Sequence, residues 1–262
     1  MAAVLVAVLL GASVYEYWIL PGASFDRDVL FQTSTIAALL VGVYDGDLTL
    51  KQLQEHGDIG IGTFNDLDGE MIGLDGKFYQ VRVDGAAYLV NDSMLTPFAE
   101  VTFFEPDMTA ISHEPLNYTQ LESYLDGLLP TKNIFYVIKV KGLFEYVKTR
   151  SVPRQNKPYP PLQKAVQNQS IFEFHKIEGT IVGVRAPDSM SGLSVPGYHF
   201  HFITNDRRAG GHLLDCNIQN VTMEIDNTQG FHMIFLGSED FYKANLTGEE
   251  QKELGPVEKQ PR

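Results

Sequence analysis

The stretch from Gly197 to His212, GYHFHFITNDRRAGGH, is the most informative part of the sequence. Its first half places histidines between large apolar residues, a pattern that predicts a β-strand. Side chains two apart on a strand point to the same face, so His199 and His201 are expected to face one pocket. Asn205 to Gly211 supplies turn residues, which allows the chain to fold back as a hairpin. His212 then opens the returning strand close to the first pair.

Three histidines arranged in this way indicate a metal site. Three neutral imidazoles with one open position are more typical of a catalytic zinc site than of a closed structural one. Cys216 is the only cysteine, which excludes an intrachain disulfide and a thiolate zinc site. The sequence therefore predicts zinc ligands at His199, His201 and His212. The competing interpretation is structural, with two histidines on a polar strand face and a third in a turn.

Length and charge limit the other possible functions. The chain of 262 residues is long enough for a substantial core, in one large domain or two small ones. Its net charge of −13 argues against nucleic acid or an anionic membrane surface as a partner, because both require clustered Lys and Arg. A small anionic substrate requires only one well-placed cation and is compatible with this charge.

The rest of the chain predicts an α+β fold with two domains built on β-sheets. Helices are expected at Thr33–Val41, from Thr49 to Gln54 and at Tyr118–Leu129. Asp-Gly pairs between Gly57 and Val90 predict consecutive hairpins, within a mixed sheet that carries the N-terminal helices. Further strands, mostly antiparallel in the second half, are expected at Val101–Phe104, at Ile134–Val147 as two strands around Gly142, and at Ile171–His175, Gly179–Arg185, Tyr198–Ile203, His212–Cys216, Val221–Ile225 and Phe231–Leu236.

A proline-rich segment marks the expected domain junction. Val152 to Leu162 (VPRQNKPYPPL) holds four of the thirteen prolines and cannot pair inside a sheet. The predicted organisation is a leader at 1–24, an N-terminal α+β domain at 25–155 and a C-terminal β-rich domain at 156–262. The C-terminal domain would carry the zinc site.

Two features indicate a secreted protein. Ala2 to Leu10 is a nine-residue apolar run followed by small residues, as in a secretory signal, although a basic region before it is missing. Five of the eleven asparagines begin N-x-S/T sequons, more than chance would produce. A bacterial, cytoplasmic protein with chance sequons is the alternative. The predicted glycosylation sites are Asn91, Asn117, Asn168, Asn220 and Asn245.

Carboxylates and an arginine could complete an enzyme site. In GTFNDLDGEM (62–71), turn acids would be held rigidly at the rim of a sheet, and Asp66, Asp68 and Glu70 all fit this position. Spacing alone selects none of them, and solvated turn acids are the plainer interpretation. Arg150 ends a strand before the proline-rich segment, where a guanidinium could hold a carboxylate bidentately or could be a surface charge.

Three separated motifs now carry a resemblance. GTFNDLDGEM, FEYVKTRSVPRQNKPYPPL (144–162) and PGYHFHFITNDRRAGGH (196–212) together resemble the α-acetolactate decarboxylases, from about Val29 to the C-terminus. The resemblance implies a zinc enzyme that converts (S)-2-acetolactate to (R)-acetoin and carbon dioxide, and that forms a homodimer. It implies zinc on the three histidines, a substrate-side threonine at Thr63, and active-site roles for Glu70, Arg150 and a tail glutamate. By counting from Asp240, Phe241, Leu246 and Thr247, Glu258 resembles the tail glutamate of the family. Glu249, Glu250 and Glu253 lie nearby in the sequence and are the alternatives.

The expected chemistry agrees with these residue types. Zinc would stabilise the enediolate left by loss of carbon dioxide, and neutral histidines would preserve its charge. Arg150 would anchor the carboxylate, and Glu70 or Glu258 would manage the proton that sets the R configuration. Two alternatives remain open, a cupin-like metal oxygenase that also uses His-x-His on a strand and a secreted β-sheet binding protein with incidental histidines.

Overall fold

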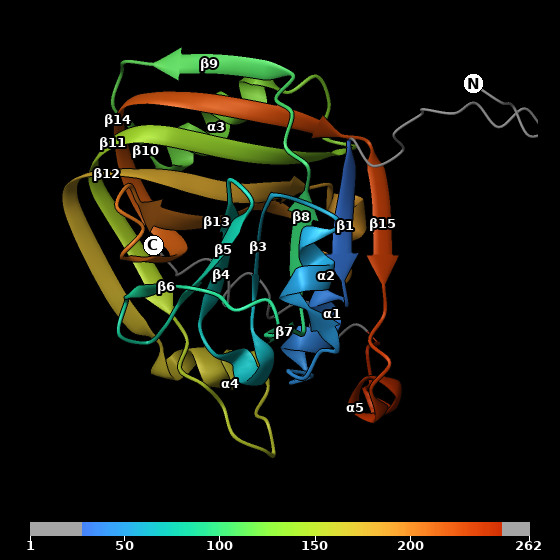
Figure 1. The fold of residues 1–262 in the computed structure, drawn as a ribbon. Coiled ribbons are helices and arrows are strands. Elements are labelled where there is room, and N and C mark those ends of the chain that lie inside the picture. Colours follow the sequence, from blue (N-terminus) through green and yellow to red (C-terminus); the bar gives the residue numbers. More distant parts are fainter. Residues whose placement is uncertain (1–27, 248–262) are drawn as a thin grey trace, which may run out of the picture.

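The computed structural model describes residues 28–247, and strands dominate it. Two large sheets pack face to face, and their strands cross steeply (Figure 1). The α+β class and the mixed and antiparallel character expected of the two sheets are confirmed. The predicted leader, 1–24, and Glu258 lie outside the described residues.

The first sheet has seven strands in the order β15-β1-β8-β3-β4-β5-β6. Neighbours are antiparallel except β1 and β15, which run parallel. The expected hairpins between Gly57 and Val90 are confirmed as β3 to β6. A separate pair joins β2 (Leu48–Thr49) to β7 (Leu95–Thr96). The seven strands are β1 (Val29–Thr33), β3 (Ile59–Thr63), β4 (Glu70–Leu74), β5 (Lys77–Val81), β6 (Ala87–Leu89), β8 (Ala99–Thr102) and β15 (Gly230–Ile234).

The second sheet has six antiparallel strands, five of them in the order β10-β14-β11-β12-β13. The sixth, β9, pairs with β14 on the edge that also carries β10. The start of β14 also pairs with β13, so β11, β12, β13 and β14 form a closed ring of hydrogen-bonded strands. Figure 1 shows β11, β12 and β14 as long curved strands. The six strands are β9 (Met108–Ser112), β10 (Leu116–Asn117), β11 (Phe135–Ser151), β12 (Ser170–Ala186), β13 (Gly197–Thr204) and β14 (Gly210–Thr228).

The long strands correct the sequence prediction, which divided β11 into two strands around Gly142 and divided β12 and β14 similarly. Gly142 pairs directly with Gly179, and a bulge follows it. A side chain at Gly142, where φ is +157°, would come within 2.4 Å of the Asn220 carbonyl oxygen. Glycine here permits close approach inside a bent strand and does not end the strand.

Helices cover the outer faces and one end of the sheets. α2 (Leu50–Gln54) begins with a capping box at Thr49, the N-cap predicted from the sequence, and α3 (Tyr118–Leu128) begins with one at Asn117. The first predicted helix is shorter than expected. Thr33 ends β1, and α1 (Ile36–Leu40) starts behind its N-cap Thr35. Short helical segments complete the fold at η1 (Asn65–Leu67), α4 (Leu162–Ala165), η2 (Val166–Asn168), η3 (Asp188–Met190) and α5 (Glu239–Lys243).

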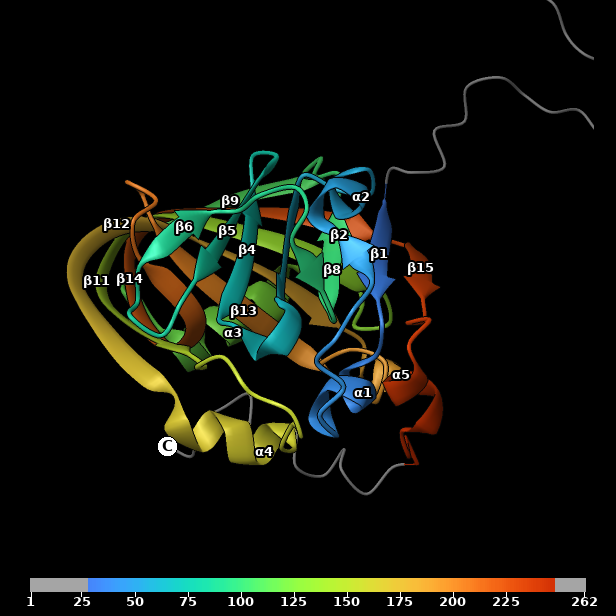
Figure 2. The same cartoon turned by 60° about the horizontal axis from the view of Figure 1, so that its bottom comes forward.

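The core that matters for the site lies between the two sheets. Ile61 and Ile72 of the first sheet pack there with Val182 and Ile203 of the second. A smaller cluster at one end contains α1, α4 and Val152, and both helices lie at the lower side of the molecule in Figure 2. The pocket described below takes its apolar side from this smaller cluster.

Strands from both sides of the proline-rich segment share the six-stranded sheet. β11 precedes the segment and is hydrogen-bonded to β12 and β14, which follow it. β15, near the C-terminal end of the described chain, joins the seven-stranded sheet through β1. The division of the chain at residue 155 stays a prediction.

Candidate active site

The β13–β14 hairpin brings three histidines together. His199 and His201 lie on one face of β13, and His201 pairs across the hairpin with His212. The three rings are buried, with centroids 5.1 to 5.3 Å apart. Candidate ligand atoms of all three lie within 4.8 Å of one another. This confirms the hairpin and the shared face predicted from the sequence.

The orientation of His201 suits a metal ligand. Its Nδ1 lies 2.7 Å from the carbonyl oxygen of Met71 on β4. A carbonyl only accepts, so Nδ1 carries the hydrogen and Nε2 keeps its lone pair. Nε2 is buried without a hydrogen-bond partner among residues 28–247, and the nearest carboxylate oxygen, Glu70 Oε2, lies 3.8 Å away. A buried nitrogen acceptor beside two further imidazoles fits a divalent ion such as zinc.

Burial keeps the His199 and His201 rings neutral. It lowers the pKa of His199 to about 3, and the nearby Arg150 guanidinium lowers it further. The pKa of His201 lies well below its usual range because of burial and the adjacent His199, a shift that its hydrogen bond to Met71 partly opposes. A neutral imidazole is the form that binds a metal, so the site needs no proton release from these two rings at neutral pH.

Glu70 faces the histidines from the other sheet. It begins β4 and pairs with Thr63, the last residue of β3. The hydroxyl of Thr63 donates to the Gly69 carbonyl at 2.7 Å. Between the two strands, Asp66 and Leu67 both adopt positive φ values, +63° and +54°, so the turn is tight. The β3–β4 turn therefore presents Thr63 and Glu70 side by side.

Only one of the three turn acids expected as alternatives lines the pocket. Glu70 is 7% exposed and lies beside His201, whereas the Asp66 carboxylate contacts Arg154 and Tyr159 outside the pocket. Asp68 is half-buried and is not among the residues that line the pocket. Register in the folded sheet separates these acids, which spacing in the sequence could not do.

Arg150 reaches the pocket from β11. Its side chain is 4% exposed, and Nη1 donates a hydrogen bond to Gln169 Oε1 at 3.3 Å. In the sheet, its backbone lies opposite His212 of β14 on one side and Ile171 of β12 on the other. The approach of β14 requires glycine at Gly211, where φ is +138° and a side chain would come within 2.4 Å of the Arg150 carbonyl oxygen. The guanidinium is thus a buried group beside the histidines and not a surface charge.

These groups enclose a small cavity of about 30 Å³. This volume exceeds the roughly 10 to 15 Å³ that a single water molecule requires. One side is polar and the other is an apolar wall from α1, the β3–β4 turn, the residue before β8, the end of β11 and α4. This wall could not be predicted from the sequence, because its members are separate apolar residues with no shared motif. The polar residues are Thr63, Glu70, Arg150, His199, His201 and His212, and the wall residues are Ile36, Leu39, Leu67, Phe98, Val152 and Leu162.

The remaining predicted sites are separate from this pocket. All five sequon asparagines, Asn91, Asn117, Asn168, Asn220 and Asn245, are exposed. The described part of the chain contains no helix that is long and apolar enough to span a membrane.

Known proteins resemble this chain along most of its length. The family model for alpha-acetolactate decarboxylase matches residues 30–248. An alpha-acetolactate decarboxylase from Methanosarcina mazei is 52% identical over 88% of this chain and 81% of its own length. One from Bacillus subtilis strain 168 is 44% identical over 83% of this chain and 85% of its own length.

Solved structures agree with the sequence comparison. The crystal structure of alpha-acetolactate decarboxylase from Bacillus subtilis strain 168 has a TM-score of 0.87 at 42% identity, covering 88% of this chain and 100% of that one. A Staphylococcus aureus protein of unknown function, similar to alpha-acetolactate decarboxylase, has a TM-score of 0.82 at 30% identity, covering 87% and 97%. The chain therefore belongs to the alpha-acetolactate decarboxylase family and is an enzyme of the decarboxylase class, a lyase.

Proposed function

We propose that the protein converts (S)-2-acetolactate to (R)-acetoin and carbon dioxide, with a zinc ion held by His199, His201 and His212. The observation that carries this proposal is the meeting of three buried histidines, a carboxylate and a guanidinium in one buried pocket. When bound, zinc would supply a Lewis acid for the ketone and hydroxyl oxygens of the substrate.

The reaction requires a place for one electron pair and one proton. The bond between C2 and the carboxylate breaks, carbon dioxide leaves, and the electron pair moves toward the C3 oxygen to give an enediolate. C2 then takes a proton, which yields acetoin. The side chains of the pocket must orient the carboxylate before it leaves and deliver the proton to one face of C2.

Arg150 is suited to hold the carboxylate. A guanidinium can donate two parallel hydrogen bonds to a carboxylate, and burial strengthens them. Arg150 is buried next to His212 in the strand register, so an anion held by it would lie beside the three histidines. In this role Arg150 fixes the direction in which carbon dioxide departs.

Glu70 is suited to move the proton. Its carboxylate lies on the histidine side of the pocket, 3.8 Å from His201 Nε2, and comes from the opposite sheet. We assign it the transfer to C2, with Thr63 as a substrate contact next to it. Glu258 is proposed as a second proton-handling group from the tail, outside the described residues. The apolar wall would contact the substrate methyl groups and exclude water.

Acetoin release tests the proposal. Purified protein is given racemic acetolactate with and without a chelator, and the product is analysed on a chiral column. The expected result is (R)-acetoin from half of the substrate, loss of activity with chelator, and recovery with added zinc. Absence of acetoin would overturn the proposed reaction. Bound iron with oxygen consumption would instead favour the oxygenase alternative.

We further propose that the protein is secreted, glycosylated and homodimeric. The apolar N-terminal run and the five exposed sequon asparagines support secretion and glycan attachment, and the family resemblance supports the dimer. Expression in a eukaryotic secretory host should give a shortened N-terminus and a mass loss on deglycosylation. An intact Met1 with no mass change would favour a cytoplasmic protein, and sedimentation would test the dimer.

A further inference from the structure

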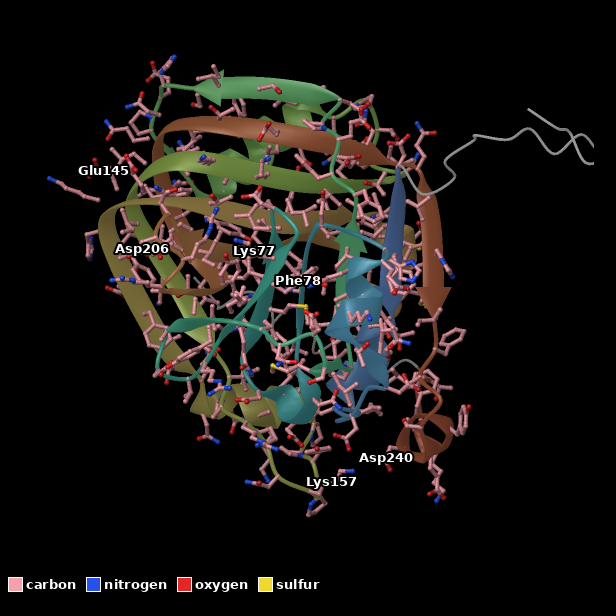
Figure 3. The ribbon with its side chains drawn as sticks, in the orientation of Figure 1. Lys77, Phe78, Glu145, Lys157, Asp206 and Asp240 are labelled. Carbon is pink, nitrogen blue, oxygen red and sulfur yellow. The ribbon has the colours of Figure 1, made fainter. Side chains whose placement is uncertain are left out.

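The proline-rich segment 152–162 forms part of the pocket as well as a surface loop. Its two ends, Val152 and Leu162, belong to the apolar wall. Between them the segment loops out to the lower side of the molecule, where Figure 3 shows Lys157 close to Asp240 of α5. The segment therefore links the pocket to contacts at the surface, and these contacts hold its position.

The main surface contact is with Asp66 in the β3–β4 turn. The Asp66 carboxylate forms an ion pair with Arg154 and accepts a hydrogen bond from the Tyr159 hydroxyl. The backbone is joined as well, because the Gln155 N–H donates to the Asp66 carbonyl at 2.7 Å. One residue of the turn thus contacts three residues of the proline-rich segment.

A second carboxylate extends this contact. The Tyr159 hydroxyl also lies 2.8 Å from Asp45 Oδ1, and Lys157 pairs with Asp45 at 2.5 Å. The Tyr44 hydroxyl donates to the Pro160 carbonyl at 2.9 Å. The result is an alternating row of cation, carboxylate, phenol, carboxylate and cation. We name it the clamp, and it consists of Arg154, Asp66, Tyr159, Asp45 and Lys157.

Asp66 is placed so that the clamp can act on the pocket. Its left-handed backbone, with φ of +63°, is followed by Leu67, which lines the pocket and also has positive φ. Gly69 then donates to the Val152 carbonyl at 3.2 Å, and Glu70 follows directly. A shift of the turn relative to the segment would therefore move Leu67, Val152 and Glu70 relative to the histidines.

We propose that Asp66 is a positioning residue, which fixes Glu70 and the apolar wall by clamping the β3–β4 turn to the proline-rich segment. This inference rests on the proposed function, because Glu70 is taken as the group that protonates C2. The histidines lie on another hairpin, whose strand register sets their common position. Loss of the clamp should therefore reduce turnover and stereoselectivity while bound metal is retained.

The variant Asp66→Asn tests this inference. Asparagine tolerates the left-handed backbone and keeps an oxygen for Tyr159, but it removes the charge that pairs with Arg154. We expect kcat to fall on the order of tenfold or more, because small misplacements of reacting groups cost that much. The zinc content, the circular dichroism spectrum and the melting temperature are measured on the same samples.

Asp75→Asn is the matched control. Asp75 also has a left-handed backbone, with φ of +55°, and it also pairs with an arginine, Arg207, at 3.5 Å. Its turn joins β4 to β5 and does not line the pocket. The control should keep wild-type kcat and a product of unchanged enantiomeric purity.

Arg154→Gln and Tyr159→Phe provide the same test if Asp66→Asn fails to fold. The double variant Asp66→Asn/Arg154→Gln should be no slower than Asp66→Asn alone, because both changes remove one ion pair. The inference is overturned if the folded variants keep wild-type kcat and product purity. Loss of zinc together with activity would also overturn it, because the clamp would then support the metal site. If the wild type itself makes no acetoin, the proposed function fails instead.

Discussion

The two sheets contribute to the pocket in different ways. The six-stranded sheet supplies the three histidines from a single hairpin, where strand register brings the rings within 5.1 to 5.3 Å of one another and the Met71 carbonyl orients His201. The seven-stranded sheet supplies Thr63 and Glu70 from a tight turn that is held by other segments. The candidate metal site is therefore a largely local device, whereas the position of the acid depends on packing between distant parts of the chain.

The largest effect is expected from His201→Ala, which tests the local device. Replacing a residue that only hydrogen-bonds to a metal ligand typically lowers metal affinity by roughly 10- to 100-fold. Removing one of the three ligands itself should lower it further. Zinc content by elemental analysis and acetoin release should both fall to background. His113→Ala, at an exposed histidine outside the pocket, is the control. Full zinc occupancy in His201→Ala would show that the hairpin is not the metal site.

Glu70→Gln separates the acid from the metal site. Glutamine keeps the size of the side chain and removes its charge, so zinc should stay bound while kcat falls by roughly 10²- to 10⁴-fold. The remaining acetoin should be less pure in the R enantiomer, as measured on a chiral column. If zinc is lost instead, Glu70 is chiefly a metal ligand and the two sheets are not separable in function.

Arg150→Lys tests the group that joins the two regions. Lysine keeps the charge but cannot form the planar pair of hydrogen bonds, so kcat/KM should fall about a hundredfold, with a loss in kcat as well as in affinity. Arg82→Lys, at an exposed arginine directly after β5, should leave both constants unchanged. Near-normal kinetics for Arg150→Lys would make Arg150 peripheral to the reaction.

The smallest effect concerns stability and not activity. Asp226 lies on β14, as does His212, but it is fully buried outside the pocket. Burial, with added repulsion from Asp28, Asp107 and Glu105, raises its pKa to about 6 from 3.8. The folded protein therefore binds more protons than the unfolded chain between these values, so the free energy of unfolding should fall as pH rises from about 4 to 6.

Asp226→Asn removes this titration. Above pH 6 it should raise the free energy of unfolding by up to about 3 kcal/mol, and near pH 4 it should change little. Denaturant titrations at pH 4.5 and pH 8 measure the difference, and exposed Asp92→Asn is the control. Equal effects at both pH values would show that the Asp226 charge does not limit stability. Unchanged acetoin release in Asp226→Asn would show that Asp226 takes no part in the reaction, although it lies on the same strand as His212.

Much of the fold was predictable wherever a few neighbouring residues decide the structure. The capping residue Thr49 marked one helix correctly, the amphipathic pattern of Tyr118–Leu129 marked another, and Asp-Gly turns marked the hairpins. The long strands were misjudged because Gly142 resembles a turn signal in sequence. It serves as a bend only because Gly179 and Asn220 lie against it in the folded sheet.

The α+β class and the histidine hairpin were predictable from the sequence, because strand periodicity and a short turn are local patterns. Only the packing of the two sheets places Glu70, and not Asp66 or Asp68, opposite the histidines. It also decided that Arg150 is buried beside His212 and that α1 and α4 form the apolar wall. The contact between His201 and Met71 joins residues 130 positions apart. Such contacts depend on how two sheets pack, which no local pattern specifies.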